Sequence, residues 1–247
     1  MKDKPLIIAE VGLNHLGKEN YAKSYLKKIL KNNIDGISFQ IREKSFLINY
    51  EKFKYYKEKN INNFDLNDKF YLYAQKLCKK KNKLFGIAIC EKKKINFFSK
   101  IKIDFFKIIN QDIKKLDLIK KISDSKVKNI FISTGQCTNK DIKNCLKIFK
   151  KKKKRIFLVH TKFLKNIQTE DFERINFLKK KFKVRVAFGN HYHGIKGIIT
   201  SLSHNVDAVL FYVKGEKKII YPDHNHAIYF SRINKLVDKI NRFKKKK

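Results

Sequence analysis

The stretch IIAEVGLNHLG, residues 7–17, decides how the rest of this sequence is interpreted. It begins as an apolar, β-branched run, which is typical of a buried strand. It then carries Glu10, Asn14 and His15 in close succession. A core strand gains nothing from these groups, because a buried polar group is costly unless it finds a partner. We therefore interpret residues 7–17 as a strand whose carboxyl end forms part of a functional site.

Apolar runs of this kind recur along the whole chain, with amphipathic stretches between them. The runs lie at 6–12, 36–41, 83–89, 105–110, 129–135, 155–161, 185–191 and 207–213, and the helical stretches include 19–33, 66–82, 115–124, 138–150 and 169–182. In DIKNCLKIFK, for example, Ile142, Cys145 and Phe149 share one helical face. Near-continuous apolar strands separated by helices indicate a parallel sheet that is covered on both faces.

The number and spacing of these strands predict a single α/β domain, residues 1–247, folded as a (β/α)8 TIM barrel. An open, doubly wound sheet is the alternative. No G-x-G-x-x-G follows the first strand, which counts against a dinucleotide-binding sheet. Segment 43–65 is expected to be an elaborated loop after the second strand, and 224–243 a last helix.

Composition separates a globular protein from other classes. Hydrophobic residues make up 43% of the chain, which is enough for a core, and no run of about 18 apolar residues predicts a membrane span. The N-terminus MKDKPLIIAE lacks the features of a signal peptide. The four cysteines show no C-x-x-C spacing, so we expect reduced thiols in a cytoplasmic protein.

The formal net charge of +38 has two interpretations. It suits a nucleic acid or an anionic membrane surface. It also suits compositional drift, because the lysines are scattered over every predicted helix instead of forming one face. We favour drift, and we expect neither a specific nucleic acid nor a membrane as partner. A positive surface would still favour anionic substrates such as phosphates.

Polar residues gather where the predicted strands end. In a TIM barrel these ends form one rim, which carries the chemistry. Six of the seven histidines follow predicted strands, and only His204 is expected within a helix. The candidate rim residues, in chain order, are Glu10, Asn14, His15, Gln40, Arg42, Asn110, Asp112, Ser133, Thr134, His160, His191, His193, Asp223 and His224.

The residue types on this rim suggest anion binding and a divalent metal. His191-x-His193 and His224-x-His226 are candidate ligand pairs, although loop histidines at this spacing are as often solvated. The STG of residues 133–135 precedes a helix and suits a phosphate or carboxylate. Lys107, inside a strand, needs an anionic partner if it points into the barrel. Together these features suggest aldol-like carbon–carbon bond formation, in which a metal polarises a carbonyl.

Several motifs resemble, in order and spacing, the barrel domain of the sialic acid synthases, the N-acetylneuraminate synthase family. They are IIAEVGLNHLG, GISFQ, FFKIINQDIKKLDLIKKI, NIFISTGQCTNKDI, LVHT, FGNHYHG and YPDHNHAI. The resemblance implies a cytoplasmic enzyme of surface carbohydrate biosynthesis. Such an enzyme condenses phosphoenolpyruvate with an amino-sugar aldehyde and uses Mn²⁺ or Mg²⁺. A homodimer is one possible oligomeric state of such an enzyme.

The resemblance also implies roles for particular residues. Glu10, with Asn14 and His15, would lie beside the reacting carbons, and Lys107 and Ser133 would hold phosphoenolpyruvate. Asp112 and Asp223 would lie near the sugar. His191 matches one metal ligand; His193 and His224 are further candidate ligands that the resemblance does not itself assign.

Several positions depart from the family pattern. Ser38 replaces a lysine, Ile87 falls where a hydroxyl is usual, and Tyr212 stands where a second metal histidine is expected. We also expect the family's small antifreeze-like domain to be lacking. Compensating groups would come from Arg42, Lys214, His160, His193 and His224.

Three functional hypotheses follow. The first is a divergent synthase with a changed acceptor. The second is a catalytically degenerate barrel that binds a sugar or a partner. The third is a binder of polyanions. The rim favours the first, because Glu10, Lys107, Ser133 and His191 all persist.

Overall fold

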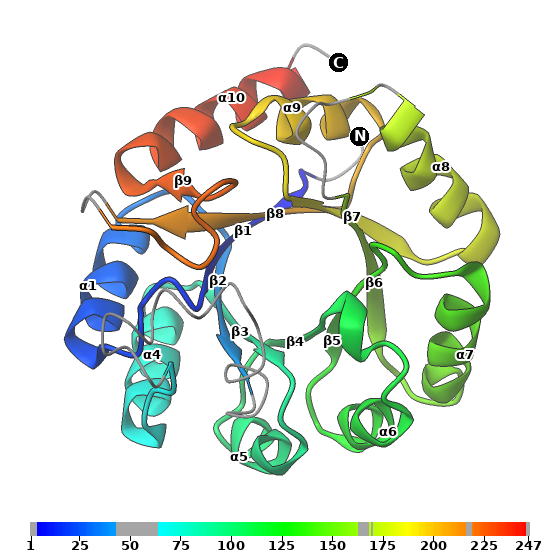
Figure 1. The fold of residues 1–247 in the computed structure, drawn as a ribbon, viewed down its shortest axis with the longest axis horizontal. Helices are drawn as coiled ribbons and strands as arrows, with labels where there is room; N and C mark the ends of the chain where they lie inside the picture. The colour runs from blue at the N-terminus through cyan, green and yellow to red at the C-terminus, as the bar shows by residue number, and fades with distance from the viewer. Residues whose placement is uncertain (1–3, 43–63, 163–167, 169, 216–218, 246–247) are drawn as a thin grey trace.

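Eight parallel strands close into a barrel in the computed structural model, which describes residues 4–42, 64–162, 168, 170–215 and 219–245 (Figure 1). The strands are β1 (Leu6–Gly12), β2 (Gly36–Ile41), β3 (Leu84–Ile89), β4 (Phe105–Ile108), β5 (Asn129–Ser133), β6 (Arg155–His160), β7 (Arg185–Asn190) and β8 (Ala208–Lys214). Each pairs with the next, and β1 also pairs with β8. The predicted TIM barrel is confirmed, and the open sheet is excluded.

Helices cover the outside of this barrel (Figure 1). They are α1 (Glu19–Ile29), α4 (Asp68–Lys80), α5 (Ile95–Lys100), α6 (Leu116–Asp124), α7 (Asn139–Phe149), α8 (Glu170–Phe182), α9 (Lys196–Ser203) and α10 (Ile233–Lys245). Local signals fix some of their ends. Helix α7 begins with a capping box, in which Thr138 and Asp141 each bond to the other's backbone N–H.

Two apolar layers are built from the alternation of side chains along the strands. One face packs outward against the helices, as Ile130 and Ile132 do. The other face fills the barrel. This inner layer consists of Ile8, Phe105, Phe131, Phe157, Val159, Ala187, Ala208 and Leu210. The rings of Phe131 and Phe157 stack with centroids 4.4 Å apart. Because both faces are buried, the strands read as apolar runs.

The inner face changes from apolar to polar toward the carboxyl ends of the strands. Side chains two residues apart share a face of a strand. Glu10 therefore stands above Ile8, Lys107 above Phe105, Ser133 above Phe131 and Tyr212 above Leu210, each one step beyond the inner apolar layer. The period of the strand brings these four polar side chains into one barrel mouth.

The region after β8 differs from the prediction. Residues 224–232 do not extend the last helix. They form turns, the short strand β9 (Ile228–Tyr229) beside β8 and the 3-10 helix η4 (Phe230–Arg232), and α10 begins only at Ile233. The pairing of β9 with β8 competes successfully with helix formation here. The predicted loop at 43–65 lies mostly outside the described residues.

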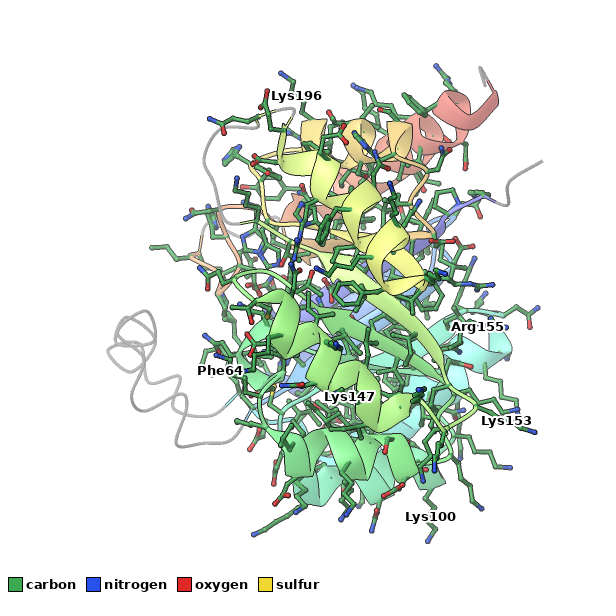
Figure 2. All side chains as sticks on the ribbon, turned by 90° about the vertical axis from the view of Figure 1, so that its right-hand side faces the viewer. Phe64, Lys100, Lys147, Lys153, Arg155 and Lys196 are labelled. Carbon is green, nitrogen blue, oxygen red and sulfur yellow. The ribbon has the colours of Figure 1, made fainter. Side chains whose placement is uncertain are left out.

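Basic side chains surround the molecule instead of forming one face. In Figure 2, Lys196, Lys100 and Lys153 mark the top, bottom and right-hand edges of the molecule. Within the described ranges, no helix is both long and apolar enough to cross a membrane.

Candidate active site

A buried ion pair lies at the centre of the barrel mouth. The Lys107 ammonium contacts Glu10 Oε1 at 2.6 Å, and the two residues are each 2% exposed. Lys107 thus has the anionic partner that its position in a strand demanded. The other carboxylate oxygen, Glu10 Oε2, is buried and has no hydrogen-bond partner among the described residues. A buried oxygen without a partner is a natural point of contact for a substrate.

Two further side chains surround this pair. The hydroxyl of Ser38, from β2, donates to Glu10 Oε1 at 3.4 Å. The ring of Tyr212, from β8, lies 5.6 Å from the Lys107 ammonium. Burial, followed by the negative charges of Glu10 and Asp223, raises the pKa of the Tyr212 phenol well above its ordinary value. Tyr212 is therefore a neutral hydroxyl at physiological pH.

Ser133 and Thr134 play different parts in the STG segment. Ser133 shares the inner face of β5 with Phe131 and is 5% exposed. Thr134 donates its hydroxyl to the carbonyl of Val159 at 3.2 Å, which ties this segment to β6. Of these two residues, Ser133 is the one on the inner face of the barrel.

Asn14 joins the loop after β1 to the end of β8. Its amide nitrogen donates to the carbonyl of Val213 at 2.8 Å, and its oxygen accepts from the backbone N–H of Asp223 at 3.0 Å. Both polar ends of Asn14 are thus used to position backbone. Asn14 therefore has a structural role: it links the end of β8 to the backbone of Asp223.

His15 and His160 do not line the barrel interior. The His15 ring lies 5.9 Å from Phe39, and the His160 ring lies 6.3 Å from Phe188. Both phenylalanines belong to the outer apolar layer. Burial lowers the pKa of His15 to about 3 and that of His160 to about 4. Both imidazoles are consequently neutral. Both residues lie near the carboxyl ends of strands, but their side chains point outward, toward the helices, and not into the barrel.

Gln40 and Arg42 form a pair at the end of β2. In the amide orientation that satisfies both polar atoms, the Gln40 oxygen accepts from Arg42 Nε at 2.6 Å. Arg42 Nη1 also lies 3.5 Å from the side-chain oxygen of Gln111. The positive charge of the guanidinium acts on Tyr212 in the barrel interior. It lowers the pKa of that phenol, but by less than burial and the nearby carboxylates raise it.

Asn110 and Asp112 lie in a short 3-10 helix, η3 (Asn110–Asp112), directly after β4. The Asn110 carbonyl accepts from the Cys137 thiol at 3.6 Å. Asp112 is 1% exposed and pairs with Lys115 at 3.0 Å. Beside them, Ala88, Cys90 and Ile109 form a small apolar cluster at the mouth. One side of the mouth is therefore apolar.

The predicted metal residues do not all meet. His191 lies with its ring centroid 4.6 Å from that of His226 and 5.5 Å from that of Tyr212. His193 is exposed. His224 stacks on Tyr221 with centroids 6.2 Å apart. Throughout the described ranges, no three His, Cys, Asp or Glu side chains converge as a metal site. His191 and His226 are therefore two imidazoles that lie side by side, without a third His, Cys, Asp or Glu ligand converging on them among the described residues.

Sequence analysis treated Tyr212 only as a replacement for a metal histidine, and His226 only as one half of a His-x-His pair. Tyr212 carried a usable signal, because it lies two residues beyond the inner-layer residue Leu210. The spacing His224-x-His226 did not show which of the two histidines faces the mouth, because the turn that carries them is positioned by contacts with the distant loop after β1.

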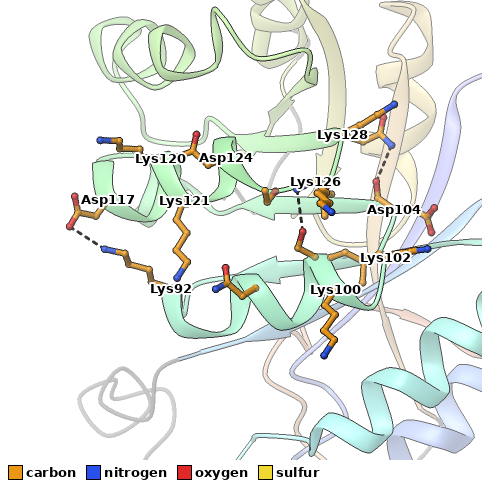
Figure 3. A pocket seen from close by; sticks show the side chains of 16 residues that line it. Lys92, Lys100, Lys102, Asp104, Asp117, Lys120, Lys121, Asp124, Lys126 and Lys128 are labelled. Atoms are coloured by element: carbon orange, nitrogen blue, oxygen red, sulfur yellow. Dashed lines mark hydrogen bonds and ion pairs between the residues drawn. The ribbon is translucent and has the colours of Figure 1, made fainter.

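A basic groove between α5 and α6 lies away from this mouth (Figure 3). Lysines from both helices line it, and Lys92 pairs with Asp117 across it at 3.5 Å. Two other lining residues, Asp104 and Asn129, stand at the amino ends of β4 and β5. The groove therefore runs along the outside of the barrel, from Lys92 and Asp117, which follow the carboxyl ends of β3 and β4, to the amino ends of β4 and β5.

Known proteins share both the sequence pattern and the fold. N,N'-diacetyllegionaminic acid synthase from Campylobacter jejuni subsp. jejuni serotype O:2 is 24% identical over 258 residues, covering 98% of this chain and 77% of that protein. An uncharacterised protein of Methanocaldococcus jannaschii is 25% identical over 221 residues, 88% of this chain. The match covers 64% of that archaeal protein, just under two thirds of its length.

Solved structures agree on the fold. The N-acetylneuraminic acid synthetase of Leptospira borgpetersenii serovar Hardjo-bovis superposes with a TM-score of 0.86 at 23% identity, covering 99% of this chain and 85% of that one. The spore coat polysaccharide biosynthesis protein spsE of Bacillus subtilis superposes with a TM-score of 0.83 at 17% identity, covering 100% of this chain and 70% of that one.

A model of the NeuB family matches residues 24–247, nearly the whole chain. With its barrel and its motifs in agreement, the chain belongs to the NeuB family, the sialic acid synthase family that its sequence resembles.

Proposed function

We propose that this protein is a sugar-acid synthase of carbohydrate biosynthesis, which condenses phosphoenolpyruvate with an amino-sugar aldehyde. The observation that carries the proposal is the buried Glu10–Lys107 pair, with Glu10 Oε2 left without a partner among the described residues. Membership of the NeuB family and the names of the Campylobacter and Leptospira relatives support the substrate class.

The reaction needs an anion site and a proton donor close together. Its new bond joins the methylene carbon of phosphoenolpyruvate to the aldehyde carbon, whose oxygen takes up a proton. Water adds at the carbon that becomes the ketone, and phosphate leaves. Lys107, with Ser133 on the neighbouring strand, attracts the anion, and Glu10 exchanges a proton with the aldehyde oxygen. A divalent metal, when bound, polarises the aldehyde carbonyl.

The pairing of Glu10 with Lys107 suits these two roles, proton exchange by Glu10 and anion binding by Lys107. One carboxylate oxygen is held by the ammonium at 2.6 Å, so the carboxyl group is oriented before substrate arrives. The second oxygen is directed to no other described group and is available to the reacting atoms. The phenol of Tyr212, neutral beside the pair, is a donor and not a competing anion.

A degenerate, sugar-binding barrel is the second candidate. The apolar cluster of Ala88, Cys90 and Ile109 favours it, because an anion site normally offers hydroxyls or N–H groups. Such a barrel would bind an aldehyde sugar without releasing phosphate.

Phosphate release tests the proposal directly. Purified protein is incubated with phosphoenolpyruvate, Mn²⁺ and a panel of amino-sugar aldehydes that includes N-acetylmannosamine. We expect release that depends on the sugar and falls about 10²–10⁴-fold in Glu10→Gln. The matched control is Glu173→Gln, an exposed glutamate on α8, which should match wild type. Equal rates in wild type and Glu10→Gln would contradict the proposal, and sugar binding without release would establish the second candidate.

A further inference from the structure

Although basic side chains surround the molecule, the carboxylates that could balance them are unevenly placed. Acidic residues lie in the first turns of α1, α4, α6, α7 and α8, which begin beside the carboxyl ends of the strands. The turns that lead from a helix back into a strand are basic instead. Five of these turns contain eleven lysines and one carboxylate, that of Asp104. They are residues 81–83, 101–104, 125–128, 150–154 and 183–184.

Folding therefore brings lysines that are dispersed in the sequence to the amino end of the barrel. Figure 2 shows this end at the right-hand edge of the molecule, where Lys153 and Arg155 are labelled. The excess of positive charge over carboxylates makes this end attractive to an anionic partner.

The carboxylates of the basic groove between α5 and α6 are already engaged (Figure 3). Asp104 accepts the backbone N–H of Phe85 at 2.8 Å. Asp124 pairs at 2.6 Å with Lys152, which is not one of the lining residues. The third aspartate, Asp117, forms the ion pair across the groove. Seven lysines line the groove, and six of them form no ion pair with any described carboxylate.

A second basic groove adjoins the first at the amino end of the barrel. Its lining includes Lys4, Arg155, Lys183 and Arg185. The Lys154 ammonium, which also lines the second groove, donates at 2.7 Å to the carbonyl of Val127 in the lining of the first. The two linings are therefore continuous, and we call them together the two-groove surface.

The size and lining of the first groove indicate an extended ligand that is recognised through its charge. Its volume of about 1170 Å³ exceeds the roughly 300–1,000 Å³ of a small-molecule pocket. None of its described lining residues is aromatic, so it offers no platform on which unstacked bases could lie. In a nucleic-acid duplex the bases are already stacked and the phosphates face outward. Lysines contact phosphates as point charges and do not read the bases.

A membrane surface fits these grooves less well. Proteins that bind the bilayer interface commonly add large apolar side chains to their basic residues. The large apolar side chains exposed on the described part of the chain all lie outside both grooves. They are Leu72, Leu116, Phe177 and Ile220.

We propose that the two-groove surface binds the phosphate backbone of double-stranded nucleic acid without sequence preference. The inference goes beyond the proposed function, and the surface shares no residue with the Glu10–Lys107 pair and its neighbours in the barrel mouth. Contacts of this kind release counterions from the phosphates, so binding weakens steeply as salt rises. The expected Kd at physiological salt is about 10⁻⁴–10⁻⁶ M.

Fluorescence anisotropy of a short labelled DNA duplex, titrated with the full-length protein, tests the proposal. The double variant Lys126→Glu, Lys128→Glu reverses two exposed charges of the first groove and should weaken binding at least about tenfold. It should also reduce the slope of log K against log salt by about 2. The matched control is Lys235→Glu, Lys239→Glu on α10, which changes the net charge equally but lies outside both grooves. This control should bind nearly like wild type.

Arg155→Glu, in the second groove, supplies a single-site test and should weaken binding as well. Two duplexes of unrelated sequence should bind alike, and equal thermal unfolding midpoints establish that the variants are folded. Equal losses in the two double variants would show that only the overall charge attracts the duplex, and would overturn the proposal. Binding to phosphatidylserine vesicles but not to the duplex would overturn it in favour of a membrane. Phosphate release, which tests the proposed function, should be the same in all these variants.

Discussion

The carboxylate of Glu10 and the ammonium of Lys107 are 97 residues apart in the chain and 2.6 Å apart inside the barrel. One comes from β1 and the other from β4, so no short segment of the chain forms this pair. Both groups have been removed from water, which is costly, and each offsets the cost of the other.

Removal of one partner should therefore destabilise the protein more than removal of both. In Lys107→Met the Glu10 carboxylate is left buried and unpaired, at a cost of about 3–5 kcal/mol in the free energy of unfolding. The double variant Glu10→Gln, Lys107→Met leaves no buried charge and should be more stable than Lys107→Met alone. Urea unfolding followed by circular dichroism measures both, and strictly additive losses would show that the two groups do not interact.

Gly12 should tolerate no side chain. Its φ is +57°, and a Cβ there would lie 2.6 Å from the Tyr212 ring and 3.0 Å from a carboxylate oxygen of Asp223. Gly194 also has a positive φ, +73°, but a Cβ there would meet nothing within 4 Å. Gly194→Ala should thus lower the free energy of unfolding only through backbone strain, by on the order of 1 kcal/mol. Gly12→Ala should lower it clearly more, because the new Cβ also clashes. Thermal unfolding compares the two variants, and equal losses would mean that Tyr212 and Asp223 move aside freely.

Asn14→Leu should loosen the rim. It removes the partners of the Val213 carbonyl and the Asp223 N–H, and each unsatisfied group costs about 1–3 kcal/mol. Hydrogen exchange at the Asp223 amide should become faster. Asn32→Leu is the control, because Asn32 also donates to two carbonyls, those of Lys28 and Ile29, but only within its own surface turn. Protection of Asp223 that survives Asn14→Leu would show that the loop is held by other contacts.

Acid should destabilise the protein partly through His15. The folded protein keeps this imidazole neutral down to a pKa of about 3, whereas the unfolded chain takes up a proton near 6.5. Stability from this group is therefore complete above pH 6.5 and is lost as the pH falls toward 3. Between pH 7 and pH 5 the loss is about 2 kcal/mol.

His15→Asn retains an acceptor for the Gly17 N–H, which His15 Nδ1 accepts at 3.1 Å, but does not titrate. Its unfolding free energy should fall less steeply between pH 7 and pH 5 than that of wild type. The measurement is urea unfolding at a series of pH values. Parallel curves for the two proteins would mean that His15 takes up its proton equally in both states.

The sequence by itself determined the eight strands of the barrel and which residues share a face of each of them. Because side chains alternate along a strand, Glu10 must share a face with Ile8, and Lys107 must share a face with Phe105, whatever the arrangement of the strands. Apolar residues on both faces then demanded a covered parallel sheet, and the eight strands predicted the barrel. Among the described residues, the start of the last helix, expected at 224, was misplaced, because β9 pairs with β8 there.

Only the tertiary structure decided which rim residues meet. Strand alternation places side chains inside or outside but does not direct those in the loops, whose direction is fixed by distant contacts. His15 and His160 therefore pack against the outer layer, although both follow strands. His226, and not His224, faces His191, because the Asp223 backbone is bonded to Asn14, which lies 209 residues earlier in the chain. Such a contact depends on closure of the barrel, which no local pattern of residues encodes.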